Sequence, residues 1–541
     1  MDWAFVNGII HGPGRRRASA VATSGGRIVY TGSDEGAKAL AGLRTEVIDL
    51  RGKMIVPAFC DAHIHPLLGG INLTGLDLIS FKTLNEYQIR LREYSCENPA
   101  RSFIRGSGWM HGCFPHSGPN KSDLDKIISD RPVFLKAIDG HSAWVNSKAL
   151  EMAGITKNTS DPVGGRIERD DQTGEPTGAL RELAAMALVG DRLPPPSREE
   201  MLAGARFFLS QAARYGITAI HDPMATREFM DVYLELEQRG ELTVRVSAAL
   251  VCDPASPENT IPELLELSRA CRGRQLRVET AKIFLDGVVD SHTAFLLDSY
   301  IDRPGFRGEP LWEAEEFKRT AAALDQEGIQ IHIHAIGDAA VRMALDGLEY
   351  IIGSNGRRDA RHQIAHLDLT SQMDIPRFQA LGVIAVIQPA WFYMDSNFFD
   401  SALPFLGKAR AMQLYRMRSL MESGAAVASS SDWPFGGDRI TFNPLDTIKI
   451  GRTRRGIGGD FQEAYNPEEG VSVESLIDSH TIVGAYANFL DGETGSIEPG
   501  KIADLVVLDR DLLGVPAEEI HQTRVLLTLL GGYPVFRDEC F

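Results

Sequence analysis

The sequence has no apolar run that approaches the roughly 18 residues of a membrane-spanning helix. Its first residues, MDWAFVNGIIHGPGRRR, lack the basic stretch followed by an apolar core that marks a secretory signal. None of its 6 cysteines forms a C-x-x-C pair, which favours free thiols in a reducing compartment. We therefore expect a cytoplasmic protein without a membrane partner.

Basic residues are also fewer than acidic ones. The sequence has 56 Lys and Arg residues and 73 Asp and Glu residues, which gives a net charge of −17. A chain of this sign does not suit the phosphate backbone of a nucleic acid. The composition, 43% hydrophobic and 24% charged, is that of a soluble globular protein. The 541 residues contain no internal repeat and fit several domains or one large α/β barrel with additions.

Short apolar runs rich in β-branched residues alternate with longer amphipathic segments. Near-continuous apolarity is typical of parallel strands that are covered on both faces. One intervening segment, 197–216, predicts a helix, because Ser197 and Glu200 can form a capping box and Gly216 suits the position after the last turn. The runs lie at residues 54–63, 217–222, 244–250, 279–285, 329–334, 362–366, 383–388 and 425–432.

Eight units of strand followed by helix predict an α/β fold, the (β/α)8 TIM barrel, with a doubly wound open sheet as the alternative. Residues 72–200, between the first two strands, are too many for a loop and predict an inserted subdomain. Alternating segments near both ends predict a small β-sandwich domain that the termini share. We assign residues 1–55 and 485–541 to that domain and 56–484 to the barrel, which includes the insertion.

Two histidines, His63 and His65, end the apolar run IVPAFCDAHIHP. Residues i and i+2 of a strand project from the same face, so the pair aims two imidazoles at one point, as a metal site does. In a barrel of this kind, functional side chains gather at the C-terminal ends of the strands. The other expected strands bring Lys282, His334, His366 and Asp432 toward this end.

Each of these residues also has a plainer interpretation. A strand-end histidine can be a hydrogen-bonded core residue, Lys282 can pair with Asp286 or Glu279, and Asp432 can cap a turn. Their convergence favours the metal site, because six buried polar groups without a metal would cost stability. His332, one layer below His334, is expected to be structural.

Longer motifs spread along nearly the whole chain. They include PAFCDAHIH, GWMHGCFP, RPVFLKAIDGHSAWVNSKAL, KIFLDG, HIHAIGDAA, IAHLDL, SSSDWPF and TGSIEPGKIADLVVLD. With them the sequence resembles the amidohydrolase superfamily, specifically its YtcJ-like branch (amidohydrolase family 3), which is related to N-substituted formamide deformylases. The resemblance implies a metal-dependent barrel joined to a β-sandwich formed by both termini.

The resemblance also implies the ligands of one or two divalent ions, with zinc as the expected metal. Lys282 would react with CO2 to give a carbamate that bridges the two ions. Asp432 would bind the first ion and also carry the proton during catalysis. The complete set would be His63, His65 and Asp432 at the first ion, His334 and His366 at the second, and carboxylated Lys282 between them.

The implied activity is hydrolysis of a carbon–nitrogen bond other than a peptide bond, through metal-bound hydroxide. The partner would be a small amide, N-formyl or N-acyl compound with a hydrophobic or aromatic group. Expected substrate contacts are Trp109, His141, Trp391 and His292, the last of which stands where the family commonly has arginine. The alternatives are a cyclic-amide or lactone hydrolase, a deaminase and a non-catalytic sensor. A homodimer is the default assembly.

Overall fold

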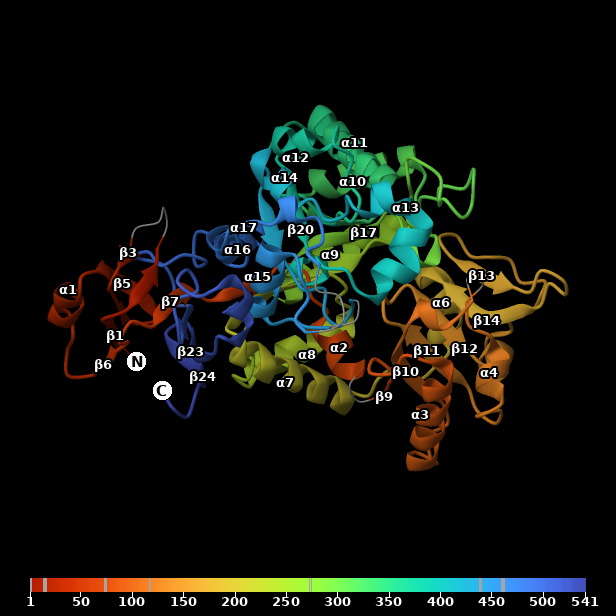
Figure 1. Ribbon diagram of the computed structural model, residues 1–541, viewed down its shortest axis with the longest axis horizontal. Helices are drawn as coiled ribbons and strands as arrows, with labels where there is room; N and C mark the ends of the chain where they lie inside the picture. The colour runs from red at the N-terminus through yellow and green to blue at the C-terminus, as the bar shows by residue number, and fades with distance from the viewer. Residues whose placement is uncertain are drawn as a thin grey trace.

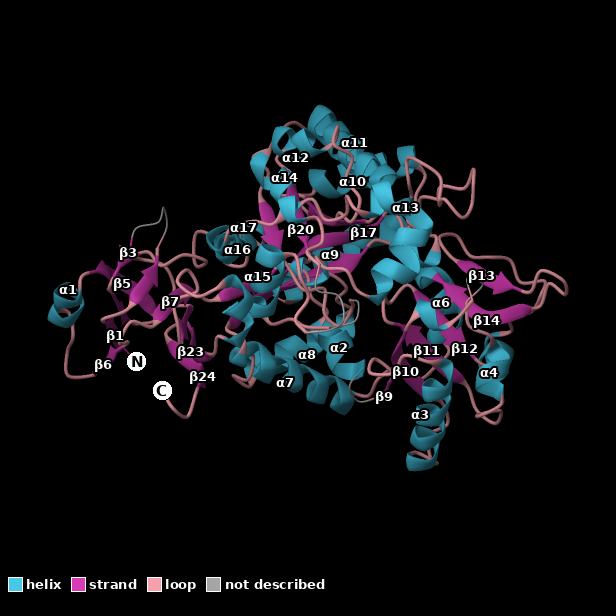
Figure 2. Cartoon of the chain, in the orientation of Figure 1, coloured by secondary structure: helices cyan, strands magenta, loops and turns pink. Residues whose placement is uncertain are grey.

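The computed structural model describes residues 2–12, 17–72, 75–115, 118–271, 273, 275–436, 440–458 and 463–541. Its centre is a sheet of 8 parallel strands, hydrogen-bonded in the order in which they follow along the chain, with helices around it (Figures 1 and 2). The strands are β8 (Phe59–Asp61), β15 (Ile217–Asp222), β16 (Arg245–Val251), β17 (Leu276–Phe284), β18 (Gln330–Ala335), β19 (Gln363–His366), β20 (Ile384–Ile387) and β21 (Val427–Ser429).

The predicted TIM barrel is confirmed, because the strand order never reverses as it would in a doubly wound sheet. Backbone hydrogen bonds from Ala62 to Ser429 and from Asp432 to His63 connect the first strand with the last. The barrel is therefore closed at the end where the polar residues lie. Among the described residues, no helix is long and apolar enough to cross a membrane.

One predicted strand is wrong in extent, because residues 54–63 form two strands in two different sheets. β7 (Met54–Pro57) pairs with β22 (Leu505–Leu508) of the terminal sheet, whereas β8 belongs to the barrel. The chain changes sheets at Ala58, whose N–H donates to the Asp504 carbonyl, while the next N–H, that of Phe59, donates to Gly216. Both parts are buried and apolar, so the sequence pattern shows no break between them.

Both ends of the chain supply the strands beside the barrel, at the left of Figure 1. A six-stranded sheet contains β2 (Ile9–His11), β3 (Arg17–Ala18), β7, β22, β23 (Val525–Leu530) and β24 (Tyr533–Arg537). A four-stranded sheet contains β1 (Asp2–Val6), β4 (Ala20–Ser24), β5 (Arg27–Gly32) and β6 (Thr45–Asp49). Their shared core joins Trp3 and Phe5 with Val507 and Leu527, so residues from the two ends of the sequence stabilise each other.

The long segment between β8 and β15 forms a sheet of its own, at the right of Figure 1. It contains β9 (Leu76–Asp77), β10 (Ile104–Trp109), β11 (Val133–Ala137), β12 (Ser142–Val145), β13 (Arg166–Arg169) and β14 (Pro176–Arg181). Helix α3 (Leu84–Glu97) contributes Tyr87 and Leu91 to its core. The turn between β11 and β12 carries Asp139 and His141 to the barrel.

Two helices hold the segment that follows the His-x-His pair. α7 (Arg198–Arg214) begins with the predicted capping box of Ser197 and Glu200. α2 (Pro66–Asn72) starts directly after His65 and packs on α7, where Gly70 and Gly204 lie in backbone contact. A Cβ atom on Gly204 would lie 2.7 Å from the carbonyl carbon of Gly70. The absence of a side chain here lets α2 sit close to α7.

We predict that Gly204→Ala lowers the free energy of unfolding by about 1–3 kcal/mol, because the new methyl group must push backbone atoms apart. Gly353→Ala is the matched control: Gly353 lies in α11 (Asp338–Asn355), where a methyl group would have no neighbouring atom within 4 Å. The control should gain up to about 1 kcal/mol from the higher helix propensity of alanine. Thermal unfolding midpoints measure both, and equal midpoints would contradict the close contact of the helices.

Candidate metal centre

The structure brings the six expected ligands to one pocket at the C-terminal ends of the barrel strands. His63 and His65 follow β8, Lys282 lies on β17, and His334 on β18. His366 ends β19 and Asp432 follows β21. Each of the six is at most 5% exposed, and all line the same pocket. Separate strands and the segments that follow them therefore contribute polar groups to a single buried volume.

Asp432 is the centre of the closest group. Its Oδ1 atom lies 3.2 Å from Nε2 of His63 and 3.1 Å from Nε2 of His65. Its Oδ2 atom lies 3.8 Å from Nδ1 of His366. His63, His366 and Asp432 each offer one ligand atom within 4.8 Å of the others, and the ring centroids of His334 and His366 are 4.4 Å apart.

A chain of hydrogen bonds fixes the proton on His63. Nε2 of Gln363 donates to the Ala487 carbonyl at 2.7 Å, which leaves its Oε1 atom to accept from Nδ1 of His332 at 2.7 Å. Nε2 of a neutral His332 must then accept from Nδ1 of His63, at 2.8 Å. Nε2 of His63 consequently carries a lone pair, yet it faces the Asp432 carboxylate. Two acceptors at this distance repel each other unless a proton or a metal ion joins them, which makes the pair a candidate metal site.

The protonation states support this arrangement, because burial holds the pKa of His63 and of His332 well below the usual histidine value, and the nearby charge of Lys282 lowers both further. Burial also lowers the pKa of His334 and of His366. All four imidazoles are thus neutral at pH 7; the lone pair of His332 accepts from His63, and the other three rings keep theirs free.

The other histidines also present free ring nitrogens. Nε2 of His334 lies 3.2 Å from the Gly287 carbonyl, which can only accept, so its Nδ1 atom is unprotonated. Nδ1 of His65 and Nδ1 of His366 are buried and have no hydrogen-bond partner among the described residues. The orphaned Nδ1 atom of His366 lies 3.8 Å from Oδ2 of Asp432, and such a pair fits a divalent ion that accepts nitrogen and oxygen ligands, as zinc does.

The side chain of Lys282 is buried in the site. Burial lowers its pKa to about 7, although the charge of Asp432 acts in the opposite direction. Neither alternative partner reaches it: Glu279 is exposed, and Asp286 accepts hydrogen bonds from the backbone of Phe295, Ile336 and Gly337. A large share of Lys282 is therefore uncharged at neutral pH, the state in which an amine is nucleophilic.

Backbone conformation also distinguishes this site. His366 and Asp432 both have left-handed backbone angles, with φ of +77° and +56°. Such conformations are unfavourable for residues with a side chain and are kept where surrounding contacts impose them. Asp61 supplies some of these contacts, since its Oδ1 atom accepts from the N–H of Ser431 at 3.0 Å and of His63 at 3.2 Å. It thereby joins the two segments that carry the closest ligands.

Two of the four expected substrate contacts lie at the site. Nδ1 of His141 lies 2.7 Å from Glu182, and the ring centroid is 5.0 Å from that of His334. Burial alone would lower the pKa of His141, but the Glu182 carboxylate raises it to about 9. The indole of Trp391 stacks on His366, with centroids 5.8 Å apart and planes at 6°.

The other two expected contacts lie elsewhere. Trp109 is fully buried in the core of the inserted sheet, where its indole nitrogen donates to the Leu135 carbonyl at 2.8 Å. His292 has a left-handed backbone that turns its ring toward Asp302, with Nε2 at 2.8 Å from the carboxylate, and Phe405 packs on it. Both side chains have partners outside the metal centre and line neither pocket that opens on it, so the structure does not bring them to the site.

Sequence reasoning missed Gln363 and Glu182, and only Gln363 carries a weak signal. It is a polar residue at the start of a short buried strand, where a side chain without a polar partner would be costly. Glu182 is 3% exposed and has a φ of +65°, but neither property is visible in a sequence. His332 was expected to be structural and lies between His63 and Gln363.

A closed parallel barrel with neutral histidines and a carboxylate at its C-terminal end defines a class of metal enzymes. The model of the amidohydrolase family matches residues 46–536, and the chain belongs to this family. The family that the motifs indicated is thus confirmed.

Several relatives match over nearly the whole chain. The identity is 32% with Protein LONG AFTER FAR-RED 3 of Arabidopsis thaliana, over 96% of this chain and 88% of that protein. It is 28% with putative amidohydrolase YtcJ of Bacillus subtilis, over 96% of each, and 27% with N-substituted formamide deformylase of Arthrobacter pascens, over 95% and 94%. An uncharacterized metal-dependent hydrolase from Pyrococcus horikoshii has a similar crystal structure, with 25% identity, a TM-score of 0.74 and coverage of 96% and 99%.

We predict that Gln363→Met weakens zinc binding by about 10- to 100-fold, because His332 loses the acceptor that fixes the proton on His63. Gln330→Met is the matched control: Gln330 is also buried and also donates to the Ala487 carbonyl, but its Oε1 atom accepts from Thr280. Competition with a chromogenic chelator measures the affinity, and circular dichroism checks the fold. Equal zinc affinities in the two folded variants would contradict the hydrogen-bond chain.

Proposed function

We propose that the protein is a metal-dependent hydrolase that cleaves the carbon–nitrogen bond of a small amide, N-formyl or N-acyl compound. The observation that carries this proposal is the unprotonated Nε2 atom of His63 facing the Asp432 carboxylate at 3.2 Å. His63, His65 and Asp432 would hold one ion, His334 and His366 a second, and carboxylated Lys282 would join them. Zinc suits these ligands, and when bound it supplies Lewis acidity that activates water and polarises a carbonyl group.

The relatives and the pocket support the choice of bond and of substrate. One relative is named a formamide deformylase, and the solved relative is described as a metal-dependent hydrolase. The pocket that opens on the candidate metal centre is lined by aromatic side chains, among them Trp391, Tyr393 and Phe435. Such walls favour a substrate with a hydrophobic or aromatic group.

Two residues of the chain have distinct roles in this proposal. The carboxylate of Asp432 accepts the proton of the attacking water and then delivers it to the departing nitrogen, since an unprotonated amine leaves poorly. His141 contacts the substrate from the inserted subdomain, because it lines the pocket and Glu182 holds its Nδ1 atom. His63, His334 and His366 keep their lone pairs available, because burial holds the pKa of each well below the usual histidine value.

Metal removal tests the reaction class. We expect hydrolysis of at least one compound in a panel of N-formyl and N-acyl aromatic amines, with cyclic amides and lactones included, and product identified by mass spectrometry. Treatment with a chelator should abolish the product, and added zinc should restore it. Failure to hydrolyse any amide, with zinc shown to be bound, would overturn the proposed substrate class.

Replacement of the proposed proton carrier tests the mechanism. Asp432→Asn should lower kcat by about 10²- to 10⁴-fold, because a carboxamide cannot take up the proton of water. Its side-chain oxygen can still bind zinc, so metal content measured by mass spectrometry should change much less than kcat. Asp374→Asn serves as a control, since Asp374 is buried but pairs with Arg342 and Arg377 outside the pocket. Near-normal turnover in Asp432→Asn would exclude the assigned role.

A further inference from the structure

The pocket continues well beyond the metal centre. From His366 and Asp432 it extends over the segments that follow β17, β19 and β20. This outer part has no role in holding a metal or in the proposed proton transfer. Its carboxylates and aromatic rings come from Asp290, Asp368, Asp395, Trp391, Tyr393, Phe398, Tyr415 and Tyr465.

Two carboxyl groups, those of Asp290 and Asp368, line this outer part. Oδ1 of Asp368 is buried without a hydrogen-bond partner among the described residues, while its Oδ2 atom is 3.5 Å from the Tyr415 hydroxyl. Burial raises the pKa of Asp368 well above its usual range, and the charge of Asp290 raises it further. Asp290 accepts hydrogen bonds from Asn397 and Ser401; burial raises its pKa to about 6, although the charge of His111 acts in the opposite direction. The described lining contains no Lys or Arg, and its His141 is held by Glu182.

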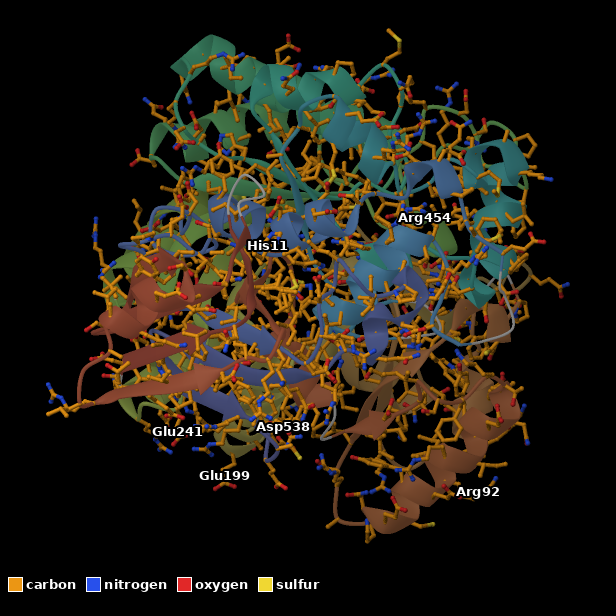
Figure 3. All side chains as sticks on the ribbon, turned by 60° about the vertical axis from the view of Figure 1, so that its left-hand side comes forward. His11, Arg92, Glu199, Glu241, Arg454 and Asp538 are labelled. Atoms are coloured by element: carbon orange, nitrogen blue, oxygen red, sulfur yellow. The ribbon has the colours of Figure 1, made fainter. Side chains whose placement is uncertain are left out.

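One guanidinium group lies close to Tyr465 but makes its hydrogen bonds to backbone carbonyls. Arg454, labelled in Figure 3, is fully buried behind the Tyr465 ring, with its central carbon 5.4 Å from the ring centroid. Its Nε atom donates to the Tyr465 carbonyl and Nη1 to that of Tyr415. Because Arg454 is absent from the described lining, the pocket faces of Tyr465 and Asp368 stay open to a ligand.

A second observation also points to a ligand. The indole N–H of Trp391 is buried in the pocket wall and has no acceptor within the described part of the chain. The pocket thus contains an unused donor stacked on His366 and an unused acceptor on Asp368. Buried polar groups without partners are costly, and a bound molecule of complementary polarity removes that cost.

We propose that this outer part of the pocket binds an organic cation, namely an ammonium or related group on the portion of the substrate remote from the cleaved bond. The inference rests on the proposed function, which it makes more specific. Carboxylates together with the faces of Trp391, Tyr415 and Tyr465 suit an alkylated ammonium ion, which uses both charge and cation–π attraction. A bare calcium or magnesium ion needs about six or more oxygen ligands, which aromatic walls do not provide.

The test compares two probes of nearly equal shape on the zinc-loaded full-length protein. Benzyltrimethylammonium carries a permanent charge and has no lone pair for zinc, whereas dimethylbenzylcarbinol is neutral. Isothermal titration calorimetry at low salt should show the cation binding at least tenfold more tightly. Asp290→Asn and Asp368→Asn should each reduce this preference at least threefold while leaving the affinity for the carbinol within twofold.

Asp171→Asn is the control for net charge, since Asp171 is exposed on the inserted subdomain, and it should keep the full preference. Equal affinities for the two probes in the unmodified protein would overturn the proposal, as would a preference that neither variant reduces. Binding requires no turnover, so a hydrolytic panel that fails while the cation still binds overturns the proposed function alone. Where hydrolysis occurs, N-acyl diamines should exceed neutral isosteres in kcat/KM by at least tenfold.

Discussion

The placement of one proton determines what the barrel interior can do. Gln363 and His332 keep the hydrogen of His63 on Nδ1, so Nε2 faces Asp432 as a second acceptor. In water such a pair would separate or take up a proton, but burial disfavours the charged imidazole. A proton on Asp432 or a cation bound by both atoms removes the repulsion between them, and the second makes the pair a candidate metal site. The lone pair on His63 Nε2 is set by a hydrogen-bond chain that starts at the Ala487 carbonyl, outside the barrel strands.

The rest of the fold fixes the distances between these atoms. Closure of the barrel by hydrogen bonds from Ala62 and Asp432 brings the first and last strands together, and this juxtaposes His63 with Asp432. Close packing of α2 on α7 fixes the segment that begins after His65. The inserted subdomain contributes His141, which Glu182 holds by a hydrogen bond. A displacement of any of these elements would change the distances on which the candidate site depends.

Much of this arrangement could be predicted from the sequence. Buried parallel strands show as continuous apolar runs, and the barrel rule that polar strand ends converge brought Lys282, His334 and His366 to the same pocket as His63. The rule concerns the ends of the barrel strands, and it says nothing of the inserted sheet, to which Trp109 of β10 belongs, or of where a loop side chain points. Trp109 and His292 therefore could not be placed, since one faces the core of its own sheet and the other is turned by a left-handed backbone. The break at Ala58 was also hidden, because both strands on either side are apolar.

The two ends of the pocket are lined by different polar groups. At the inner end lie the histidines and Asp432 of the candidate metal centre, where the proposed amide would be cleaved. At the outer end, the carboxyl groups of Asp290 and Asp368 lie among aromatic rings. A substrate with an acyl group at one end and a cation at the other would be held in one orientation, because reversal would place its charge against the metal. The net charge of −17 acts in the same direction, since it attracts cations to the protein surface before they reach the pocket.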